Sequence, residues 1–278
     1  MKDRETALTV IVSIAYGGVH DDDLRQRLTG ASVEDLRRAL EALTAEEGAL
    51  LRAMRRPLTV ERLGRHPLGN LVLASAAAAL DDYGRASIWL GEQLAIAGAV
   101  LPATIEPVRR VIETVEGDLP PRLRFVGSRL DSPGAAVAAI HHAQWALLAP
   151  GSLYRTVLST AAVPDVAGAL KSTPARVLWI ANLEPDGHET SNMTAIDHLL
   201  ALRAHGVRVD VVLHDPSATL EFDPAELAAY GVRSVSRALR SSRNPGLHDP
   251  QLLRSALAEA IFTGVPAAPA PGAHASRG

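Results

Sequence analysis

The stretch Trp145-Ala146-Leu147-Leu148-Ala149-Pro150-Gly151-Ser152-Leu153-Tyr154 decides the fold of this chain. It opens with a continuous apolar run, passes through the turn-forming pair Pro150-Gly151, and leads into a helical pattern over residues 157–162. A strand that runs through a glycine turn into a helix is the building unit of α/β proteins. We therefore expect this stretch to belong to a buried sheet.

Three other apolar runs resemble the first part of this stretch, at residues 8–14, 176–180 and 209–213. Their hydrophobicity is continuous and does not alternate, which is typical of strands buried on both faces of a parallel sheet. Helix-type segments separate them, and their starts are marked by capping residues: Ser32 with Asp35, Thr194 with Asp197, and Asp249-Pro250. The fold class that this alternation predicts is α/β, with a Rossmann-like, doubly wound and mostly parallel sheet.

The domain organisation follows from shifts in composition. We expect one α/β domain over residues 1–263, with an insert at about residues 67–126 that holds two packed helices (71–97) and shorter, more polar strands (108–126). From Gly264 the chain consists mostly of Ala, Pro and Gly, so we expect residues 264–278 to form a disordered tail.

Composition excludes several classes of protein. The 278 residues carry 28 Lys+Arg and 31 Asp+Glu without a basic block, so we expect no nucleic acid or membrane partner. There are no cysteines, which excludes disulfides, thiolate metal sites and cysteine nucleophiles. The apolar run 7–15 is too short to span a bilayer, and we expect a cytoplasmic protein.

Three segments are candidates for ligand binding. The first is Gly151-Ser152-Leu153-Tyr154, where backbone amides at a helix start would suit a phosphate or carboxylate. The second is His66-Pro67-Leu68-Gly69-Asn70, and the third is the loop that holds Asn182, Glu189 and Thr190. Each has an ordinary alternative, since Pro, Gly, Ser and Asn are common in turns and at helix starts.

No metal site and no catalytic residue is predicted. The run His20-Asp21-Asp22-Asp23 offers carboxylates for a divalent ion, but three successive aspartates are more typical of a solvated turn. His141-His142 point apart on a helix, and His188 and His198 lack a third ligand at a recognisable spacing. The phosphate loop of NTPases, the Gly-x-Gly-x-x-Gly motif and the Gly-x-Ser-x-Gly elbow are all absent, which makes Ser152 a poor nucleophile.

In their order along the chain, the motifs resemble the YvcK/CofD-like family, which contains the gluconeogenesis factors and the 2-phospho-lactate transferases. The resemblance covers residues 8–262, and the YvcK branch fits better than the transferase branch. It rests on His66-Pro67-Leu68-Gly69-Asn70-Leu71, Gly98-Ala99-Val100-Leu101-Pro102-Ala103-Thr104, Pro150-Gly151-Ser152-Leu153-Tyr154, Asn182-Leu183, Gly187-His188-Glu189-Thr190, Asp197-His198 and His248-Asp249-Pro250.

The chain also departs from that family. Members usually begin with a strand and a Gly-Gly-Gly-(Thr/His)-Gly-Leu loop, and nothing upstream of Thr6 matches it. The next family block, Asp-Asp-Gly-Gly-Ser-Ser-Gly, is Ala15-Tyr16-Gly17-Gly18-Val19-His20-Asp21 here. We expect weaker diphosphate binding, by about a hundredfold or more, because two or three backbone contacts are missing. If the missing strand is encoded upstream, a shortened chain would expose unpaired backbone and need a partner.

The resemblance implies a binder of a nucleotide or nucleotide-sugar, with a UDP-sugar first, that regulates cell-wall growth, cell shape and central carbon metabolism without catalysis. Helix-start amides would contact phosphate, and Asn70 and Asn182 would contact sugar or base hydroxyls. One alternative is a CofD-like transferase that moves a phospholactyl-type group from a nucleotide donor to an alcohol, and only this alternative needs Mg²⁺. Another is an interaction subunit that binds no ligand, as a homodimer or paired with a full-length relative.

Overall fold

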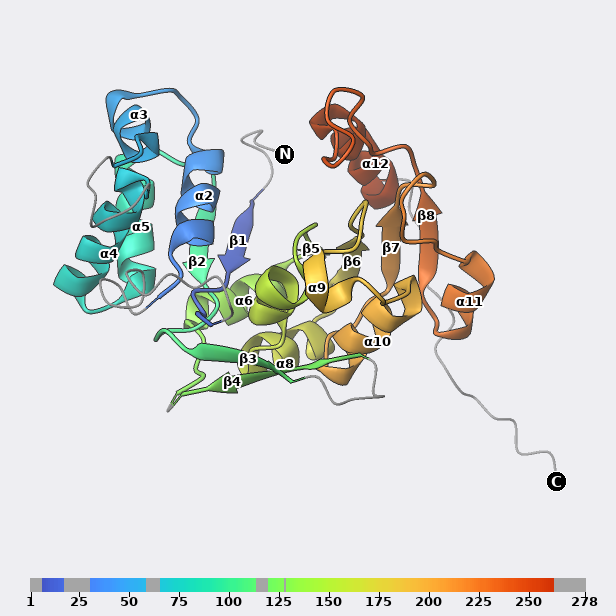
Figure 1. The fold of residues 1–278 in the computed structure, drawn as a ribbon. Coiled ribbons are helices and arrows are strands. Elements are labelled where there is room, and N and C mark those ends of the chain that lie inside the picture. The colour runs from blue at the N-terminus through green and yellow to red at the C-terminus, as the bar shows by residue number, and fades with distance from the viewer. Residues whose placement is uncertain (1–6, 18–30, 59–65, 114–119, 128, 263–278) are drawn as a thin grey trace.

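The computed structural model describes residues 7–17, 31–58, 66–113, 120–127 and 129–262. Its first part combines two strands with a layer of helices. Strand β1 (Thr9–Val12) pairs in parallel with β2 (Ala99–Pro102). The chain between them forms the helices α2 (Glu34–Leu43), α3 (Ala49–Arg55), α4 (Leu68–Leu80) and α5 (Tyr83–Gln93), which lie together on one side of the molecule (Figure 1).

An antiparallel hairpin follows. Strands β3 (Arg109–Glu113) and β4 (Arg122–Val126) pair from Arg109 with Val126 to Glu113 with Arg122. This pair confirms the shorter strands expected over residues 108–126, and α4 packed on α5 confirms the two helices expected over 71–97. Because β2 lies between these elements and pairs with β1, the division into a domain and an insert stays a prediction.

The second part contains a four-stranded parallel sheet in the order β5 (Trp145–Leu148), β6 (Arg176–Ile180), β7 (Val211–His214), β8 (Arg233–Ser236). The connections carry most of the helices: α6 (Gly134–His142) before β5, the π-helix η1 (Leu153–Leu158) with α7 (Ser159–Ala161) and α8 (Pro164–Ser172) after it, α9 (Gly187–Thr190) and α10 (Ala195–Ala204) after β6, α11 (Pro224–Ala229) after β7, and α12 (Pro250–Phe262) after β8. These strands and crossovers confirm the α/β class.

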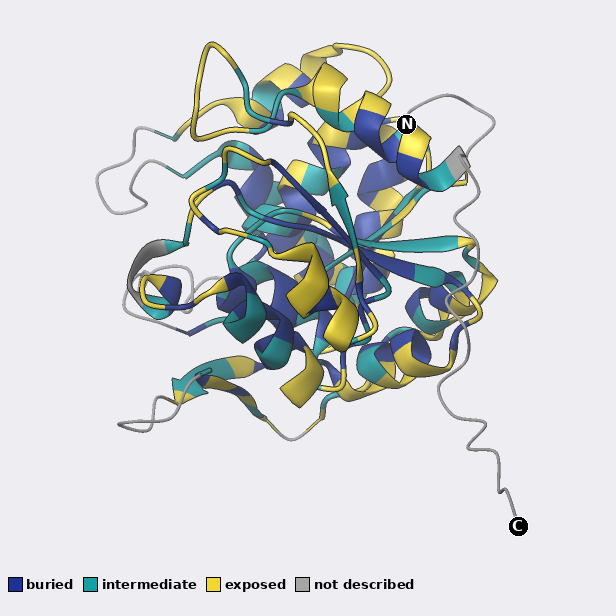
Figure 2. Ribbon diagram, turned by 90° about the vertical axis from the view of Figure 1, so that its right-hand side faces the viewer, coloured by how far each residue is buried: buried dark blue, intermediate teal, exposed yellow. Residues whose placement is uncertain are grey.

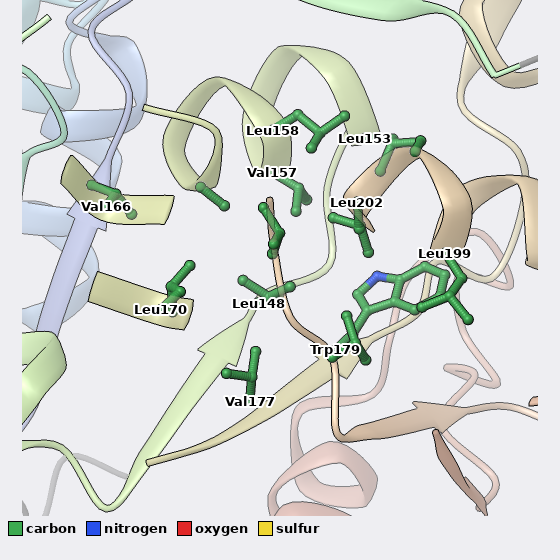
Figure 3. Packing of buried hydrophobic residues seen from close by; sticks show 14 of the residues in the cluster. Leu148, Leu153, Val157, Leu158, Val166, Leu170, Val177, Trp179, Leu199 and Leu202 are labelled. Carbon is green, nitrogen blue, oxygen red and sulfur yellow. The ribbon is translucent and has the colours of Figure 1, made fainter. Parts of the chain in front are cut away.

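Both faces of this sheet are covered, as expected for a doubly wound fold. Alternate residues of β6 point to opposite sides. Val177 and Trp179 belong to a core cluster that contains residues of η1, α8 and α10 (Figure 3), whereas Leu178 and Ile180 pack with residues of α12. Figure 2 shows the buried strands in the middle of the molecule and the exposed outer faces of the helices.

Two of the three expected caps are present. Thr194 and Asp197 form a reciprocal capping box, and Asp249 accepts from the amides of the first turn of α12. The prediction for Ser32 was wrong, because α2 begins at Glu34 and Val33 is its N-cap residue. The amide of Ser32 donates instead to the carbonyl oxygen of Ile14 (3.1 Å), a contact between distant segments that sequence spacing does not reveal.

The parallel strands form two separate hydrogen-bonded sheets. Among the described residues, β1 pairs with β2 alone and β5 pairs with β6 alone, so no hydrogen bonds join the two ladders. The expected tail at 264–278 and the acidic run at 21–23 lie outside the described residues. Within the described residues, every helix is too short or too polar to cross a bilayer.

Candidate functional site

The turn after β5 is held by a side chain from the end of β6. The side-chain oxygen of Asn182 accepts from the Gly151 amide (2.9 Å), and its side-chain nitrogen donates to the Gly151 carbonyl (2.8 Å). Leu148 pairs with Trp179, and Gly151 and Asn182 each lie three residues further along the chain. Gly151 and Asn182 therefore lie at the same level beyond the ends of their strands. The structure therefore brings together two predicted site residues, but the Asn182 amide binds the turn, which differs from its expected contact with a sugar or base.

The residues after Gly151 wind into a helix of unusual pitch. The carbonyl of Ser152 accepts from the amides of both Thr156 and Val157, each at 3.0 Å. The Ser152 hydroxyl accepts from the amide of Arg155 (3.3 Å) and caps the helix. The helix thus begins at Leu153, four residues before the helical pattern expected at 157, and π-type turns are frequent at functional sites.

The first two amides of η1 are the best candidates for contact with an anion. No described group accepts from the backbone N–H of Leu153 or Tyr154. The side chains of Leu153 and Tyr154 are not available to a ligand, because both are buried and the Tyr154 hydroxyl donates to the carbonyl of Pro121 (2.7 Å). Burial, reinforced by the negative charges of Glu189 and Asp197, raises the pKa of Tyr154. Leu153 and Tyr154 would therefore contribute backbone amides only.

A charged cluster lies beside this helix start, and it contains two residues that the sequence analysis missed. The guanidinium of Arg155 is 3.2 Å from a carboxylate oxygen of Asp186, and its Nε is 3.8 Å from Oε2 of Glu189. That Oε2 is buried and has no hydrogen-bond partner among the described residues. The position of Arg155, three residues after the predicted turn residue Ser152, is the signal that could have identified it.

Thr190 has a structural role in the same loop. Its hydroxyl accepts from the amide of Asp186 (2.7 Å) and donates to the carbonyl of the same residue (3.0 Å). The side chain is buried, so it closes the short turn of α9 from inside. By doing so it sets the position of Asp186 and Glu189 opposite Arg155. The two neighbouring predicted residues therefore differ in role. The Glu189 carboxylate faces Arg155, whereas the buried Thr190 side chain holds the turn in place.

The second predicted group lies in the helical layer. The side-chain oxygen of Asn70 accepts from Nε of Arg37 (2.7 Å), which is also paired with Glu41, and all three side chains are buried. A Cβ on Gly69 would lie 2.8 Å from Cδ of Arg37, so this glycine permits close helix packing. His66 precedes α4, and its carbonyl accepts from the Leu58 amide.

Within the described ranges, neither Gly69 nor Asn70 forms a hydrogen bond or ion pair with the turn at Gly151. The two candidate groups thus stay separate in the part of the chain that the structure describes. Asn70 and Asn182 share one property, since each uses its side-chain oxygen on the protein itself. The role of His66, Gly69 and Asn70 in ligand binding stays a prediction.

Asp215 organises the end of β7. Its carboxylate accepts from the amides of Ser217, Leu239 and Arg240 and from the Ser217 hydroxyl, at 2.6–2.8 Å. Burial raises the pKa of this group, but the hydrogen bonds outweigh burial and hold the pKa at about 2. His248, which was named only among the motifs of the family resemblance, is near the end of β6, where Ala181 supplies a backbone hydrogen bond to it. Burial lowers its pKa, and its Nε2 has no partner among the described residues.

Metal ligands do not gather in the described part of the chain. No three His, Asp or Glu side chains there are grouped closely enough to hold an ion. His198 is buried, donates from Nδ1 to the Thr194 carbonyl (2.7 Å), and stacks on Trp179. His141 and His142 end α6. The carboxylates nearest the turn, Asp186 and Glu189, face Arg155, so the described residues do not fit the divalent ion that a transferase would need.

Comparison with known proteins agrees with this architecture. The profile of a family described as 2-phospho-L-lactate transferase CofD matches residues 1–239. The gluconeogenesis factor of Bacillus subtilis is 25% identical, and the alignment covers 94% of this chain and 92% of that protein. A relative from Deinococcus radiodurans is 28% identical over 96% of this chain, which spans 63% of that relative's length.

A solved structure supports the same relationship in three dimensions. The crystal structure of a UPF0052-family protein from Bacillus halodurans superposes with a TM-score of 0.81 at 26% sequence identity, over 94% of this chain and 92% of that one. The chain therefore belongs to the CofD family and is a relative of the gluconeogenesis factors.

Proposed function

We propose that this protein binds a nucleotide-sugar at the carboxyl ends of β5 and β6 and acts as a regulator. One observation carries the proposal. The amides of Leu153 and Tyr154 lack acceptors among the described residues, while the buried Oε2 of Glu189 beside them lacks a donor. A ligand must offer anionic oxygens to the two amides and a hydroxyl group to the Glu189 oxygen. A sugar joined to phosphate has both kinds of group.

The two halves of the ligand would bind at different groups. Amides at a helix start favour phosphate through their N–H groups and the positive end of the helix dipole. A carboxylate accepts strongly from sugar hydroxyls, because a charged acceptor strengthens a hydrogen bond. We place the phosphate at the amides of Leu153 and Tyr154 and a sugar hydroxyl at Glu189. The two hydrogen bonds between Asn182 and Gly151 fix the turn that precedes these amides.

Arg155 supplies a positive charge beside the proposed phosphate position. Its guanidinium is partly exposed and is paired with Asp186. A bound phosphate would compete for it, because the same planar donor group binds carboxylates and phosphates. The neighbouring carboxylates repel a bare diphosphate, so the site favours a ligand whose sugar hydroxyls engage Glu189.

The names of the relatives support the metabolic setting of the proposal. One of them is named a gluconeogenesis factor, and the family profile is named after a transferase of a phosphate-bearing substrate. We propose a UDP-sugar as the ligand, a link to cell-wall growth, cell shape and central carbon metabolism, a cytoplasmic location and no turnover. The competing proposal is a transferase that needs Mg²⁺. Among the described residues, no group of three His, Asp or Glu side chains could hold that ion.

The test is a thermal-shift titration of the full chain with UDP-sugars, GDP, ADP and NAD(P), each with and without magnesium. A ligand at a hundredfold excess over its Kd stabilises the native state by about 2.7 kcal/mol. We expect a rise in Tm with a UDP-sugar that needs no magnesium and is lost in Glu189→Gln. Glu184→Gln is the control, because Glu184 is an exposed carboxylate that faces Arg240. A rise that requires magnesium would support the transferase, and no rise with any ligand would contradict binding.

A further inference from the structure

We infer that the outer face of α5 is a self-association site, at which a second copy of this chain packs its own α5 in the antiparallel direction. This surface, which we call the α5 face, consists of Arg85, Ile88, Trp89 and Glu92. It lies apart from the proposed ligand site, because α5 and the β5–β8 sheet are on opposite sides of the β1–β2 pair (Figure 1). The inference is therefore independent of the proposed ligand.

The inner face of α5 is held in place by the rest of the helical layer. The Ser87 hydroxyl donates to the carbonyl of Val100 in β2 (2.6 Å). A Cβ on Gly91 would lie 2.9 Å from Cδ1 of Ile96, so the helix backbone packs closely against that side chain. The residues of α5 that are buried in this way are Gly84, Ala86, Ser87, Leu90 and Gly91. The rotation of α5 about its own axis is thus fixed, and the α5 face points to solvent.

The α5 face is one strip along the helix, and its centre is apolar. With 100° of turn per residue, its four positions fall within an arc of about 100°. Ile88 is 50% exposed and Trp89 is 42% exposed, whereas Trp179 is only 4% exposed. Tryptophan is highly buried on average and is enriched at the centres of protein interfaces. Two adjacent apolar side chains that stay half-exposed therefore indicate a surface that a partner covers.

The two ends of the α5 face carry opposite charges. The Arg85 guanidinium donates to the carbonyl of Leu80 (3.4 Å), and no described residue forms an ion pair with Arg85 or Glu92. The two residues are seven positions apart, which is about 10.5 Å along the helix, so they cannot pair with each other. Both charges are thus available to a partner.

The pattern of the face is symmetric about its centre. Arg85 comes three residues before Ile88, and Glu92 comes three residues after Trp89. When two copies of α5 pack antiparallel about a two-fold axis at this centre, Arg85 of each copy lies opposite Glu92 of the other copy. Ile88 of each copy then lies opposite Trp89 of the other.

This symmetry is what an interface between identical subunits requires. A two-fold interface uses the same patch on both subunits, so the patch must be complementary to itself. A parallel arrangement of the two helices would place Arg85 opposite Arg85 and Glu92 opposite Glu92, and like charges in contact are costly. The charges therefore favour a second copy of the chain in the antiparallel direction.

The surroundings of the α5 face allow a second copy to approach. Helix α4 packs along α5, and its exposed residues are the small, uncharged Ser75, Ala78 and Ala79. Small side chains permit short distances between helix axes. The face carries one positive and one negative charge, so it has no net attraction to an anionic membrane. A second copy matches both its apolar centre and its charged ends.

The test is sedimentation velocity of the full chain at concentrations from about 1 to about 300 μM, without added ligand. We expect a reversible monomer–dimer equilibrium with a Kd of about 1–100 μM, because two apolar side chains from each copy form a smaller interface than the standard size. Trp89→Ser is expected to raise this Kd at least tenfold. Val126→Ser is the matched control, since Val126 is 41% exposed on β4, and it should leave the Kd unchanged.

Exchange of the two charges tests the antiparallel geometry. Arg85→Glu and Glu92→Arg are each expected to raise the Kd at least fivefold, because each substitution places like charges opposite each other at both ends of the interface. The double variant Arg85→Glu/Glu92→Arg restores opposite charges and should have a Kd within about threefold of the parent value. An equimolar mixture of the two single variants should form a heterodimer for the same reason.

Two controls accompany these variants. Arg129→Glu changes an exposed arginine outside the helical layer and should leave the Kd of the dimer unchanged. The substituted side chains are all exposed, so each variant is expected to keep the circular dichroism spectrum of the parent protein and a Tm within a few degrees of it.

Three results would overturn the inference. A chain that stays monomeric up to the highest concentration does not associate through α5. A dimer whose Kd is unchanged in Trp89→Ser forms at another surface of the molecule. A dimer that is weakened by Trp89→Ser, but not restored by the double charge exchange, does not have the antiparallel geometry.

Discussion

The side-chain amide of Asn182 pairs with both backbone groups of Gly151, at 2.9 and 2.8 Å, and continues the β5–β6 ladder beyond the end of its strands. The turn that follows β5 is therefore fixed by the neighbouring strand and not by its own sequence alone. This relationship sets the position of the η1 amides and makes Asn182 a positioning residue of the proposed site.

Replacement of Asn182 by alanine is expected to lower the free energy of unfolding by about 1–3 kcal/mol, because both hydrogen bonds to Gly151 are lost and the backbone groups stay partly buried. Urea denaturation monitored by circular dichroism measures this change. Asn244→Ala, in an exposed loop, is the control and is expected to stay within about 0.5 kcal/mol of the parent protein. Equal effects of the two substitutions would refute the role given to Asn182.

Replacement of Gly69 by alanine is expected to destabilise the protein by about 1–3 kcal/mol, because the new Cβ would lie 2.8 Å from Cδ of Arg37 and 3.1 Å from Met54. Thermal unfolding measures the effect. Gly168→Ala in α8 is the matched control, since nothing lies within 4 Å of its Cβ position. That variant is expected to gain about 0.5–1 kcal/mol from helix propensity, so the two substitutions should differ in sign.

Stability is expected to fall in acid through Asp215. Its pKa lies at about 2 in the folded protein, below the ordinary value of 3.8. A carboxyl group whose pKa is lowered by folding stabilises the native state above its unfolded pKa, and this contribution is lost as the pH falls from about 4 to about 2. The contribution is about 2 kcal/mol. Urea unfolding at several pH values measures it, and Asp215→Asn should show a smaller loss of stability across this window.

Replacement of Arg155 by methionine is expected to weaken binding of the UDP-sugar at least tenfold, which is about 1.4 kcal/mol, because the cation beside the helix start is lost. The fold should be retained, since this side chain is partly exposed. Fluorescence or calorimetric titration measures the Kd. Arg129→Met, which removes an exposed arginine paired with Asp131, is the control and should leave the Kd unchanged. A loss of affinity in both variants would point to a general charge effect.

The sequence predicted four of the six parallel strands that the structure describes, because continuous apolar runs such as Arg176–Ile180 carry their own signal of burial on both faces. It did not predict β2 or β8. It also predicted that Gly151 and Asn182 lie at one edge of the sheet. It did not predict that they bind each other, because the direction of a side chain depends on the register of two strands. Ser32 was misjudged for the same kind of reason, since its amide is bound by the distant Ile14.

The candidate site could be predicted only in part. Glu189 was identified, whereas Arg155 and Asp186, which pair with each other beside it, were missed because charged residues are common on protein surfaces. The division of the parallel strands into two ladders could not be predicted either. Apolar runs show that a strand is buried, but they do not show which strand is its neighbour.

The most direct test of the proposed function compares two ligands that differ by the sugar. Isothermal titration calorimetry of the full chain with UDP-glucose and with UDP gives the gain in affinity that the sugar provides. We expect at least a tenfold gain in the parent protein and in Glu184→Gln, and no gain in Glu189→Gln, because the Glu189 carboxylate accepts from a sugar hydroxyl. An equal gain in all three proteins, or no binding of UDP-glucose to the parent protein, would contradict the account.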